Sequence, residues 1–157
     1  MGEMMERTLV LLKPDAVERG LIGRIISRFE AKALKIVGIK MMRISPEISK
    51  EHYAHHLNKP FYKALEKFIT SRPIVAMAVE GPEAVEVVRK IVGATNGRKA
   101  EPGTIRGDFS ISTSTNLIHA SDSRETAEKE IKRFFKKEEL FDYEFSWEWF
   151  REAEDER

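Results

Sequence analysis

The alternation of apolar and polar positions divides the chain into short apolar runs and longer amphipathic segments. Four apolar runs have the length of strands, and they occupy residues 8–13, 35–44, 73–80 and 117–120. Segments with apolar residues three and four positions apart follow these runs, and they occupy residues 23–35, residues 49–70 and the stretches that begin near residues 82 and 122. This order predicts a single sheet covered by helices, and the pattern alone leaves its strands parallel or antiparallel.

Proline and short polar clusters mark where the predicted elements begin and end. Pro14 should end the first strand after Lys13, because proline cannot donate a hydrogen bond to a neighbouring strand. Residues 58–60, with sequence NKP, should break the second helical segment into two pieces. Asp122 and Glu125 have the spacing of a capping box, so the last helix should begin there.

Residues 93–115 predict a long loop. They contain four of the nine glycines of the chain together with many serines and threonines. Loops of this length in compact domains are usually functional or disordered. We therefore expect binding residues in or beside this segment.

The C-terminal residues show the two-residue period of an extended segment. Aromatic residues alternate with polar ones there, at positions Phe141, Tyr143, Phe145, Trp147 and Trp149. The length of 157 residues predicts one domain, residues 1–157, with residues 138–157 as an extended arm. The arm is either a last strand on its own domain or a segment laid on a neighbouring subunit, since so much aromatic area is rarely left in water on a monomer.

Charge and composition exclude several classes of protein. The 27 basic and 26 acidic residues give a net charge of +1, so no global charge calls for nucleic acid or an anionic membrane. The longest aliphatic runs are far shorter than the roughly 20 apolar residues of a membrane span. No cysteine is present for disulfides or thiolate chemistry. We therefore expect no membrane and no obligatory nucleic-acid partner, and we predict a cytoplasmic location.

Side chains would have to hold any bound nucleotide. Neither of the usual phosphate-binding patterns, GxxxxGK[ST] or GxGxxG, occurs in the chain. The long loop and the helix before it offer Arg89, Thr95 and Arg106, and Lys13 at the end of the first strand could add a positive charge. Each basic residue, taken alone, also fits a solvated surface charge.

His119 lies just before the last helix, and Glu130 follows eleven residues later. At about 100° per residue, Glu130 lies toward the buried face of that helix, where a carboxylate needs a donor. The imidazole of His119 and the hydroxyl of Ser121 are the candidate donors. A carboxylate that fixes the tautomer of a histidine can orient a nucleophile or a base, and a structurally satisfied pair is the alternative.

A second histidine pair is open to a metal hypothesis. His52 and His56 lie one turn apart on a predicted helix, and this spacing can bind zinc. His55 points to another side of that helix. No third candidate ligand stands at the spacing of a known zinc motif, so the metal hypothesis for this pair is weak.

Five stretches of the sequence together resemble the nucleoside diphosphate kinase family. They are KPDAV at residues 13–17, HYAHH at 52–56, RPIVAMAVEGPEAV at 72–85, GTIRGDF at 103–109 and NLIHASDS at 116–123. The pattern N-x-x-H-[GA]-S-D in the last stretch is specific to this family, and the similarity extends from about Thr8 to Tyr143. The resemblance implies a ferredoxin-like α+β sandwich, in which helices cover a four-stranded antiparallel sheet.

The resemblance also implies a catalytic group of five residues. His119 would be the phosphorylated nucleophile, through the ring nitrogen nearest the main chain. Glu130 and Ser121 would orient this histidine, and Tyr53 would lie beside it. Lys13 would contact the γ-phosphate and the ribose hydroxyls.

The other implied contacts hold the nucleotide. Arg89, Thr95 and Arg106 would bind the β- and γ-phosphates, and His56 would approach the α-phosphate. Mg²⁺ would be the cofactor and would be bound mainly through the phosphates, so no residue is expected to ligate the metal directly.

The sugar and the base have their own implied contacts. Asn116 would bind the 3′-hydroxyl, Phe61 would stack on the base, and Thr113 would lie on the far side of the base. Because stacking does not read base edges, purines and pyrimidines should both be accepted. Gly97 stands at a loop position that is often proline in the family, which bears on the rigidity of that loop and on its subunit contacts.

The implied activity is transfer of the γ-phosphate of a nucleoside triphosphate to a nucleoside diphosphate. A histidine nucleophile divides the transfer into two half-reactions, so ping-pong kinetics are expected. The expected partners are ribo- and deoxynucleotides and further copies of the chain, with a hexamer favoured. The alternative function is a catalytically silent ferredoxin-like module that binds nucleotides or regulates a partner.

Overall fold

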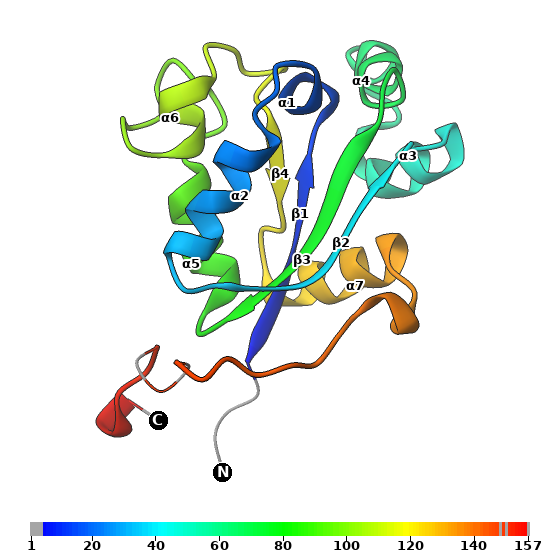
Figure 1. The fold of residues 1–157 in the computed structure, drawn as a ribbon. Coiled ribbons are helices and arrows are strands. Elements are labelled where there is room, and N and C mark those ends of the chain that lie inside the picture. Colours follow the sequence, from blue (N-terminus) through cyan, green and yellow to red (C-terminus); the bar gives the residue numbers. More distant parts are fainter. Residues whose placement is uncertain (1–4, 148, 150, 157) are drawn as a thin grey trace.

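A computed structural model describes residues 5–147, 149 and 151–156. Its strands are β1 (Glu6–Leu12), β2 (Lys35–Met42), β3 (Ile74–Gly81) and β4 (Ile118–Ala120). They form one sheet in the order β2-β3-β1-β4, and every pairing is antiparallel (Figure 1). This order is that of a ferredoxin-like fold, so the predicted α+β sandwich with an antiparallel sheet is confirmed.

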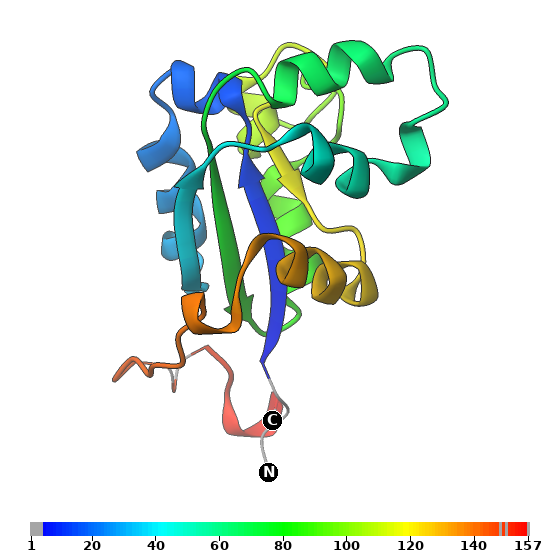
Figure 2. The same cartoon turned by 90° about the vertical axis from the view of Figure 1, so that its right-hand side faces the viewer.

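Helices cover both faces of this sheet. They are α1 (Pro14–Glu18), α2 (Ile22–Ala31), α3 (Pro46–His52), α4 (Tyr62–Ile69), α5 (Ala84–Val92), α6 (Ile105–Phe109) and α7 (Arg124–Phe134), with 3₁₀ turns η1 (Ala54–His56), η2 (Lys137–Glu139) and η4 (Glu154–Glu156). Figures 1 and 2 show α2 and α5 on one face and α7 on the other. Within the described residues, no helix has the length and apolar character needed to cross a membrane.

The uninterrupted apolar run LVLL forms β1, an interior strand of the sheet. Leu9 and Leu11 belong to the core on the side of α7, whereas Val10 and Leu12 belong to the core on the side of α2 and α5. All four side chains are fully buried. Because successive side chains of a strand point to opposite faces, the part of a strand that is covered on both faces is apolar at consecutive positions.

Two helix starts differ from the sequence prediction. β1 ends before Pro14 as predicted, but the chain then forms α1, which the pattern did not predict. Proline suits this first turn, because its missing N–H has no partner there in any case. The capping box predicted at Asp122 is wrong: Ser123 is the N-cap of α7, and its hydroxyl accepts a hydrogen bond from the N–H of Thr126 at 3.1 Å.

The long loop predicted at residues 93–115 contains the short helix α6. The hydroxyl of Thr104 caps this helix by accepting from the N–H of Gly107 at 2.9 Å. Gly97 donates its N–H to the carbonyl of Ser112 at 3.1 Å. A Cβ at Gly97 would collide with the main chain of Ser110. The loop is thus anchored by a hydrogen bond that proline at residue 97 could not make.

The C-terminal arm is irregular in structure, and none of its described residues pairs as a strand. The N–H of Phe141 donates to the carbonyl of Val37 at 2.8 Å, and the hydroxyl of Tyr143 donates to the carbonyl of Ile36. The start of the arm therefore lies against β2 of its own domain. Phe141, Tyr143 and Trp149 are exposed, so the contact with a neighbouring subunit stays a prediction.

Candidate active site

The pairing of β4 directs His119 toward α7 and α3. His119 lies opposite Leu11 of β1, and Leu11 belongs to the core on the α7 side. Residues directly opposite each other in an antiparallel pair share a face of the sheet. Ile118 and Ala120, the neighbours of His119, pack on the other face.

Asp15 of α1 fixes the turn that precedes β4. Leu117 has a left-handed backbone with φ 75°, and its N–H donates to Asp15 Oδ2 at 3.0 Å. Burial raises the pKa of the Asp15 carboxyl. Asp15 is part of the KPDAV stretch, and no role was predicted for it. Its position in the first turn after a strand end was the available signal.

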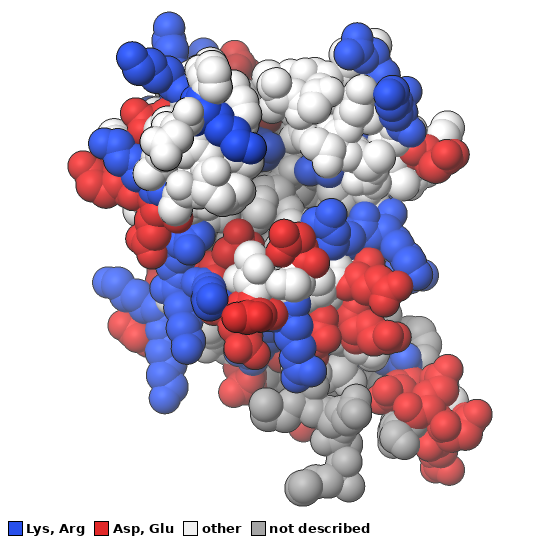
Figure 3. All heavy atoms as spheres, turned by 180° about the vertical axis from the view of Figure 1, so that it is seen from behind, with Lys and Arg blue, Asp and Glu red and all other residues white. Residues whose placement is uncertain are grey.

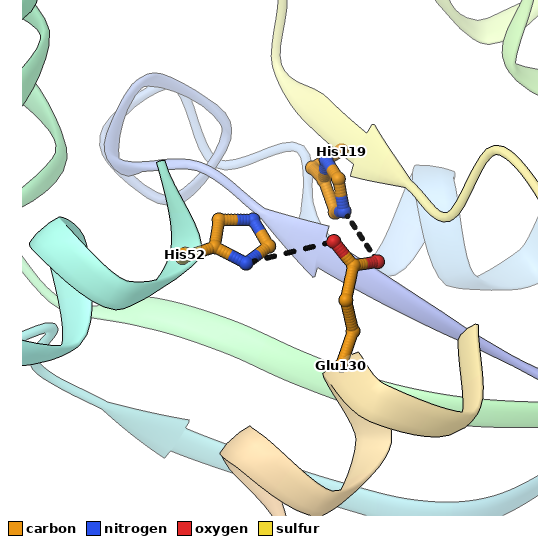
Figure 4. Close-up of side chains that lie close together, drawn as sticks. All are labelled: His52, His119 and Glu130. Carbon is orange, nitrogen blue, oxygen red and sulfur yellow. Dashed lines mark hydrogen bonds and ion pairs between the residues drawn. The ribbon is translucent and has the colours of Figure 1, made fainter. Parts of the chain in front are cut away.

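Glu130 and Ser121 hold the imidazole of His119. His119 Nε2 and Glu130 Oε1 are 3.0 Å apart (Figure 4), and the buried hydroxyl of Ser121 donates to the same oxygen at 2.6 Å. Burial by itself would raise the pKa of Glu130, but the hydrogen bonds from His119 and Ser121 and the charge of His119 outweigh it and lower this pKa to about 2. An ionised carboxylate can only accept, so Nε2 carries a proton, and in the neutral form of the ring Nδ1 then keeps its lone pair.

His52 and Tyr53 at the end of α3 form a wall beside this pair. The rings of His52 and His119 meet edge to face with centroids 4.7 Å apart, and the rings of His52 and Tyr53 do so at 4.8 Å. Among the ring contacts of the described residues, Tyr53 meets His52 and not His119. Burial raises the pKa of Tyr53, so its hydroxyl stays protonated.

Three of the predicted nucleotide contacts form a chain of hydrogen bonds. Lys13 Nζ donates to Asn116 Oδ1 at 2.8 Å, and Asn116 Nδ2 donates to the carbonyl of Thr95 at 3.0 Å. Burial, followed by the charge of Arg106, lowers the pKa of Lys13 to about 8. An anion beside this ammonium would favour its charged form.

Main-chain carbonyls hold Arg106 of α6 in place. Its guanidinium donates to the carbonyls of Gly93 at 3.0 Å, Asn116 at 3.3 Å and Ile118 at 2.6 Å. Burial, followed by the charge of Arg89, lowers the pKa of Arg106 to about 10. The side chain is thus fixed in position before any ligand binds.

The two guanidinium groups flank His119 along β4. Arg89 of α5 donates to the carbonyl of Ala120 at 3.4 Å, and Arg106 bonds Ile118 on the other side. Seen from behind, the molecule is hollowed between the α3–α4 region and the α6 region, and basic side chains lie in the hollow (Figure 3). Positive charges held together in this way favour an anionic ligand.

The remaining predicted contacts, Phe61, His56 and Thr113, have no direct link to His119 among the described contacts. The rings of Phe61 and His56 meet edge to face at 5.2 Å, and Phe61 is 50% exposed. Burial lowers the pKa of His56, whose Nδ1 has no hydrogen-bond partner among the described residues. Thr113 lies in an exposed bend of the long loop and takes part in none of these contacts.

The structure does not support a zinc site built on His52 and His56. In the described residues, the group that could hold a metal is His52, His119 and Glu130, and His56 is not part of it. Arg133 donates to His52 Nδ1 at 2.8 Å, so a cation already faces this group. No role was predicted for Arg133, although it lies three residues after Glu130 on the same helix.

The fold and the site define a class of protein. A histidine held by a buried carboxylate, with cationic side chains bonded on either side of it, suits an enzyme that handles phosphate groups. The chain belongs to the nucleoside diphosphate kinase family, whose model matches residues 6–140.

Relatives and solved structures agree with this membership. The nucleoside diphosphate kinase of Rhodopirellula baltica is 56% identical over 97% of this chain and 100% of its own length, and that of Pyrococcus horikoshii is 60% identical over 92% and 94%. The structure of the Halobacterium salinarum enzyme in complex with CDP has a TM-score of 0.92 and 48% identity, covering 95% of this chain and 99% of that one. The structure of the Borrelia burgdorferi enzyme with bound vanadate and ADP, a mimic of the transition state, has a TM-score of 0.88 and 39% identity. It covers 94% of this chain and 97% of that one.

Proposed function

We propose that this chain transfers the γ-phosphate of a nucleoside triphosphate to a nucleoside diphosphate through a phosphorylated His119. Phosphotransfer between nucleotides is the activity of the family to which the chain belongs, so the alternative of a catalytically silent module is not favoured. The observation that carries the residue assignment is the hydrogen bond between His119 Nε2 and Glu130 at 3.0 Å.

The first half-reaction begins with attack by His119 Nδ1 on the γ-phosphorus. The N–P bond forms as the bond to the leaving β-phosphate oxygen breaks, and a nucleoside diphosphate departs. Positive charge develops on the imidazole, and the carboxylate of Glu130 would stabilise it through Nε2. The second half-reaction reverses these steps with another diphosphate, which gives ping-pong kinetics.

The cationic side chains would position and neutralise the phosphates. Arg89 and Arg106 bond the carbonyls of the residues on either side of His119, and Thr95 and Asn116 are joined to Lys13 by hydrogen bonds. Phosphoryl transfer depends mainly on such positioning and charge stabilisation. Tyr53 would help to enclose the site, and its protonated hydroxyl would offer a donor.

The nucleoside would be held beyond these groups. We propose that Phe61 stacks on the base with His56 directed toward the α-phosphate, since their rings are already in contact. Thr113 is proposed to close the opposite side of the base from the long loop. Thr113 is exposed, so it would make this contact only when the nucleotide binds.

Mg²⁺ is the proposed cofactor. The donor set suits a metal held by the nucleotide: Lys13, Arg89 and Arg106 are cations and cannot ligate it, whereas phosphate oxygens are the ligands that Mg²⁺ prefers. Bound Mg²⁺ would neutralise charge on the β- and γ-phosphates.

Incubation with a γ-labelled triphosphate tests the proposal. We expect the protein to become labelled, the label to be lost in acid and to be stable in alkali, as a phosphorus–nitrogen bond requires, and added diphosphate to remove it. A His119→Ala variant should bind nucleotide and remain unlabelled. Labelling of that variant, or an acid-stable label, would contradict the assignment.

A homo-oligomer, with a hexamer favoured, is also proposed. Ile39 and Met41 on the edge strand β2 and the arm residues Phe141 and Trp149 are exposed apolar side chains, and such patches commonly mark subunit contacts. Light scattering of the intact chain measures the assembly directly, and a monomer would contradict it. The cytoplasmic location stays a prediction that cell fractionation would test.

A further inference from the structure

His52 is a buried titratable side chain in the wall of the site, and the proposed transfer does not use it. It is the last residue of α3, and only 2% of its side chain is exposed. Its ring packs edge-on against three other rings, those of Tyr53, His119 and Phe134. A polar ring in such a place needs a partner for its nitrogens.

The partner of His52 is a cation on α7. Arg133 Nη1 lies 2.8 Å from His52 Nδ1. Because a guanidinium can only donate, Nδ1 must accept, and the ring proton resides on Nε2. The ring that faces the carboxylate of Glu130 is therefore the neutral form.

The distance between His52 and Glu130 agrees with this tautomer. His52 Nδ1 and Glu130 Oε2 are 3.6 Å apart (Figure 4), which is too long for a hydrogen bond. Glu130 Oε1, by contrast, accepts from both His119 and Ser121. The carboxylate thus directs its short bonds to the nucleophile.

We propose that Arg133 keeps the buried imidazole of His52 uncharged, and that this neutral ring leaves the negative charge of Glu130 to His119. His52 is then a positioning residue, and the inference rests on the proposed role of His119 as nucleophile. A protonated ring at this position would form an ion pair with Glu130. It would weaken the hold of the carboxylate on His119 and its stabilisation of the charge that develops there.

The charged surroundings of His52 support this assignment. The titratable and charged groups that act on it are Tyr53 next to it, Glu130 and Arg133 from α7, His119 from β4 and Lys13 after β1. Burial, followed by the charge of His119, lowers the pKa of His52 to about 3, and Arg133 acts in the same direction. The ring is therefore neutral throughout the pH range in which a kinase works.

The test compares three variants with the wild-type enzyme. Arg133→Met keeps an unbranched apolar stem, although a shorter one, and removes the donor and the charge. Glu51→Gln is the control, because the 64% exposed side chain of Glu51 pairs with Arg133 Nε at 3.3 Å and not with Nη1, which contacts His52. The double variant Arg133→Met with His52→Gln has no ring to protonate. Circular dichroism and thermal unfolding would establish that each variant is folded.

Phosphorylation rates as a function of pH give the first readout. Arg133→Met should match the wild type near pH 9 and fall about tenfold below it at the acid end, because protonation of a His52 ring without its guanidinium partner shifts the acid limb of the rate profile to higher pH. Glu51→Gln should keep the wild-type profile, and the double variant should regain it. The inference is overturned if Arg133→Met loses the same factor at every pH, or if the double variant keeps the shifted limb.

Nitrogen-15 NMR of the histidine rings gives a readout that does not need activity. In the wild type, His52 should show an unprotonated Nδ1 and a protonated Nε2 with no titration above about pH 5, whereas in Arg133→Met it should titrate. A His52 ring that titrates in the wild type refutes the inference even if phosphotransfer is normal. Absence of phosphotransfer together with the expected NMR result would instead refute the role of His119.

Discussion

The two halves of the active site are built in different ways. On the side of α7, side chains hold side chains: His119, Ser121 and His52 surround the buried carboxylate of Glu130. On the other side, main-chain carbonyls position the two arginines, as for Arg106 with its three carbonyl partners.

This difference predicts how a substitution in each half should affect the enzyme. In the half beside α7, which we call the acid half, the geometry depends on the protonation state of every side chain, because each buried group is the hydrogen-bond or ion-pair partner of another. In the other half, the cation half with Lys13, Arg89 and Arg106, main-chain carbonyls already hold the arginines, so few side chains lose conformational freedom when a phosphate binds. A change in the first half should therefore affect the chemical step, and a change in the second should affect mainly the binding of phosphate.

The largest effect is expected for Glu130→Gln. An amide keeps the shape of the carboxylate but loses its charge, and it can donate to Nε2 and so favour the wrong tautomer of His119. We expect phosphoenzyme formation to slow roughly a thousandfold or more, by analogy with the carboxylate-to-amide change in a hydrolase triad. Rapid-quench kinetics measure this rate.

The matched control is Glu128→Gln, an exposed carboxylate on the same helix, which should leave the rate unchanged. Nucleotide affinity should also stay near the wild-type value in Glu130→Gln. A large loss of affinity would remove the distinction between the two halves.

Arg106→Ala should have the next largest effect, and the effect should fall on binding. The change removes a charge that faces the phosphates and leaves three carbonyls without their donor, so kcat/KM should decrease by about a hundredfold. Arg106→Lys should recover only part of this loss, because an ammonium cannot replace the planar fork. Steady-state kinetics with varied triphosphate separate KM from kcat, and a loss confined to kcat would contradict the expectation.

The pH dependence of kcat/KM should report Lys13 in the cation half. The pKa of this group is lowered to about 8 in the free enzyme. Its charge is therefore present below that pH and is lost as the pH rises through it. We expect kcat/KM to fall above about pH 8, by roughly tenfold per unit at the steepest. Lys13→Arg should move this alkaline limb to higher pH, and an unchanged limb would assign it to another group.

The smallest effect is expected for Ser121→Ala. The hydroxyl donates to Glu130 at 2.6 Å and accepts from the N–H of Leu9 at 3.3 Å. Its loss should decrease the free energy of unfolding by about 1–3 kcal/mol and slow phosphorylation only a few-fold, because His119 still bonds the carboxylate. Urea denaturation and rapid quench measure both quantities. A rate loss as large as that of Glu130→Gln would show that the hydroxyl, and not the charge, positions the histidine.

Local patterns predicted most of the elements that carry these residues. Apolar runs located the strands, and helical spacing placed Glu130 on the buried face of α7. Two short helices were missed: α1 begins at a proline that the pattern interpreted only as a strand end, and α6 lies inside a loop rich in glycine. The N-cap of α7 was placed one residue too early, because Asp122 and Ser123 are both good capping residues and only the backbone conformation selects between them.

The sequence by itself determined the alternation of strands and helices. It also determined the spacing that brings His119, Ser121 and Glu130 within hydrogen-bond distance. Both follow from local geometry, since the periods of strand and helix fix which side chains share a face. Only the tertiary structure decided that Arg89 and Arg106 flank His119 on β4, and that Arg133 bonds His52. Those contacts join residues 12 to 81 positions apart, and packing of the helices on the sheet, which no local period specifies, brings them together.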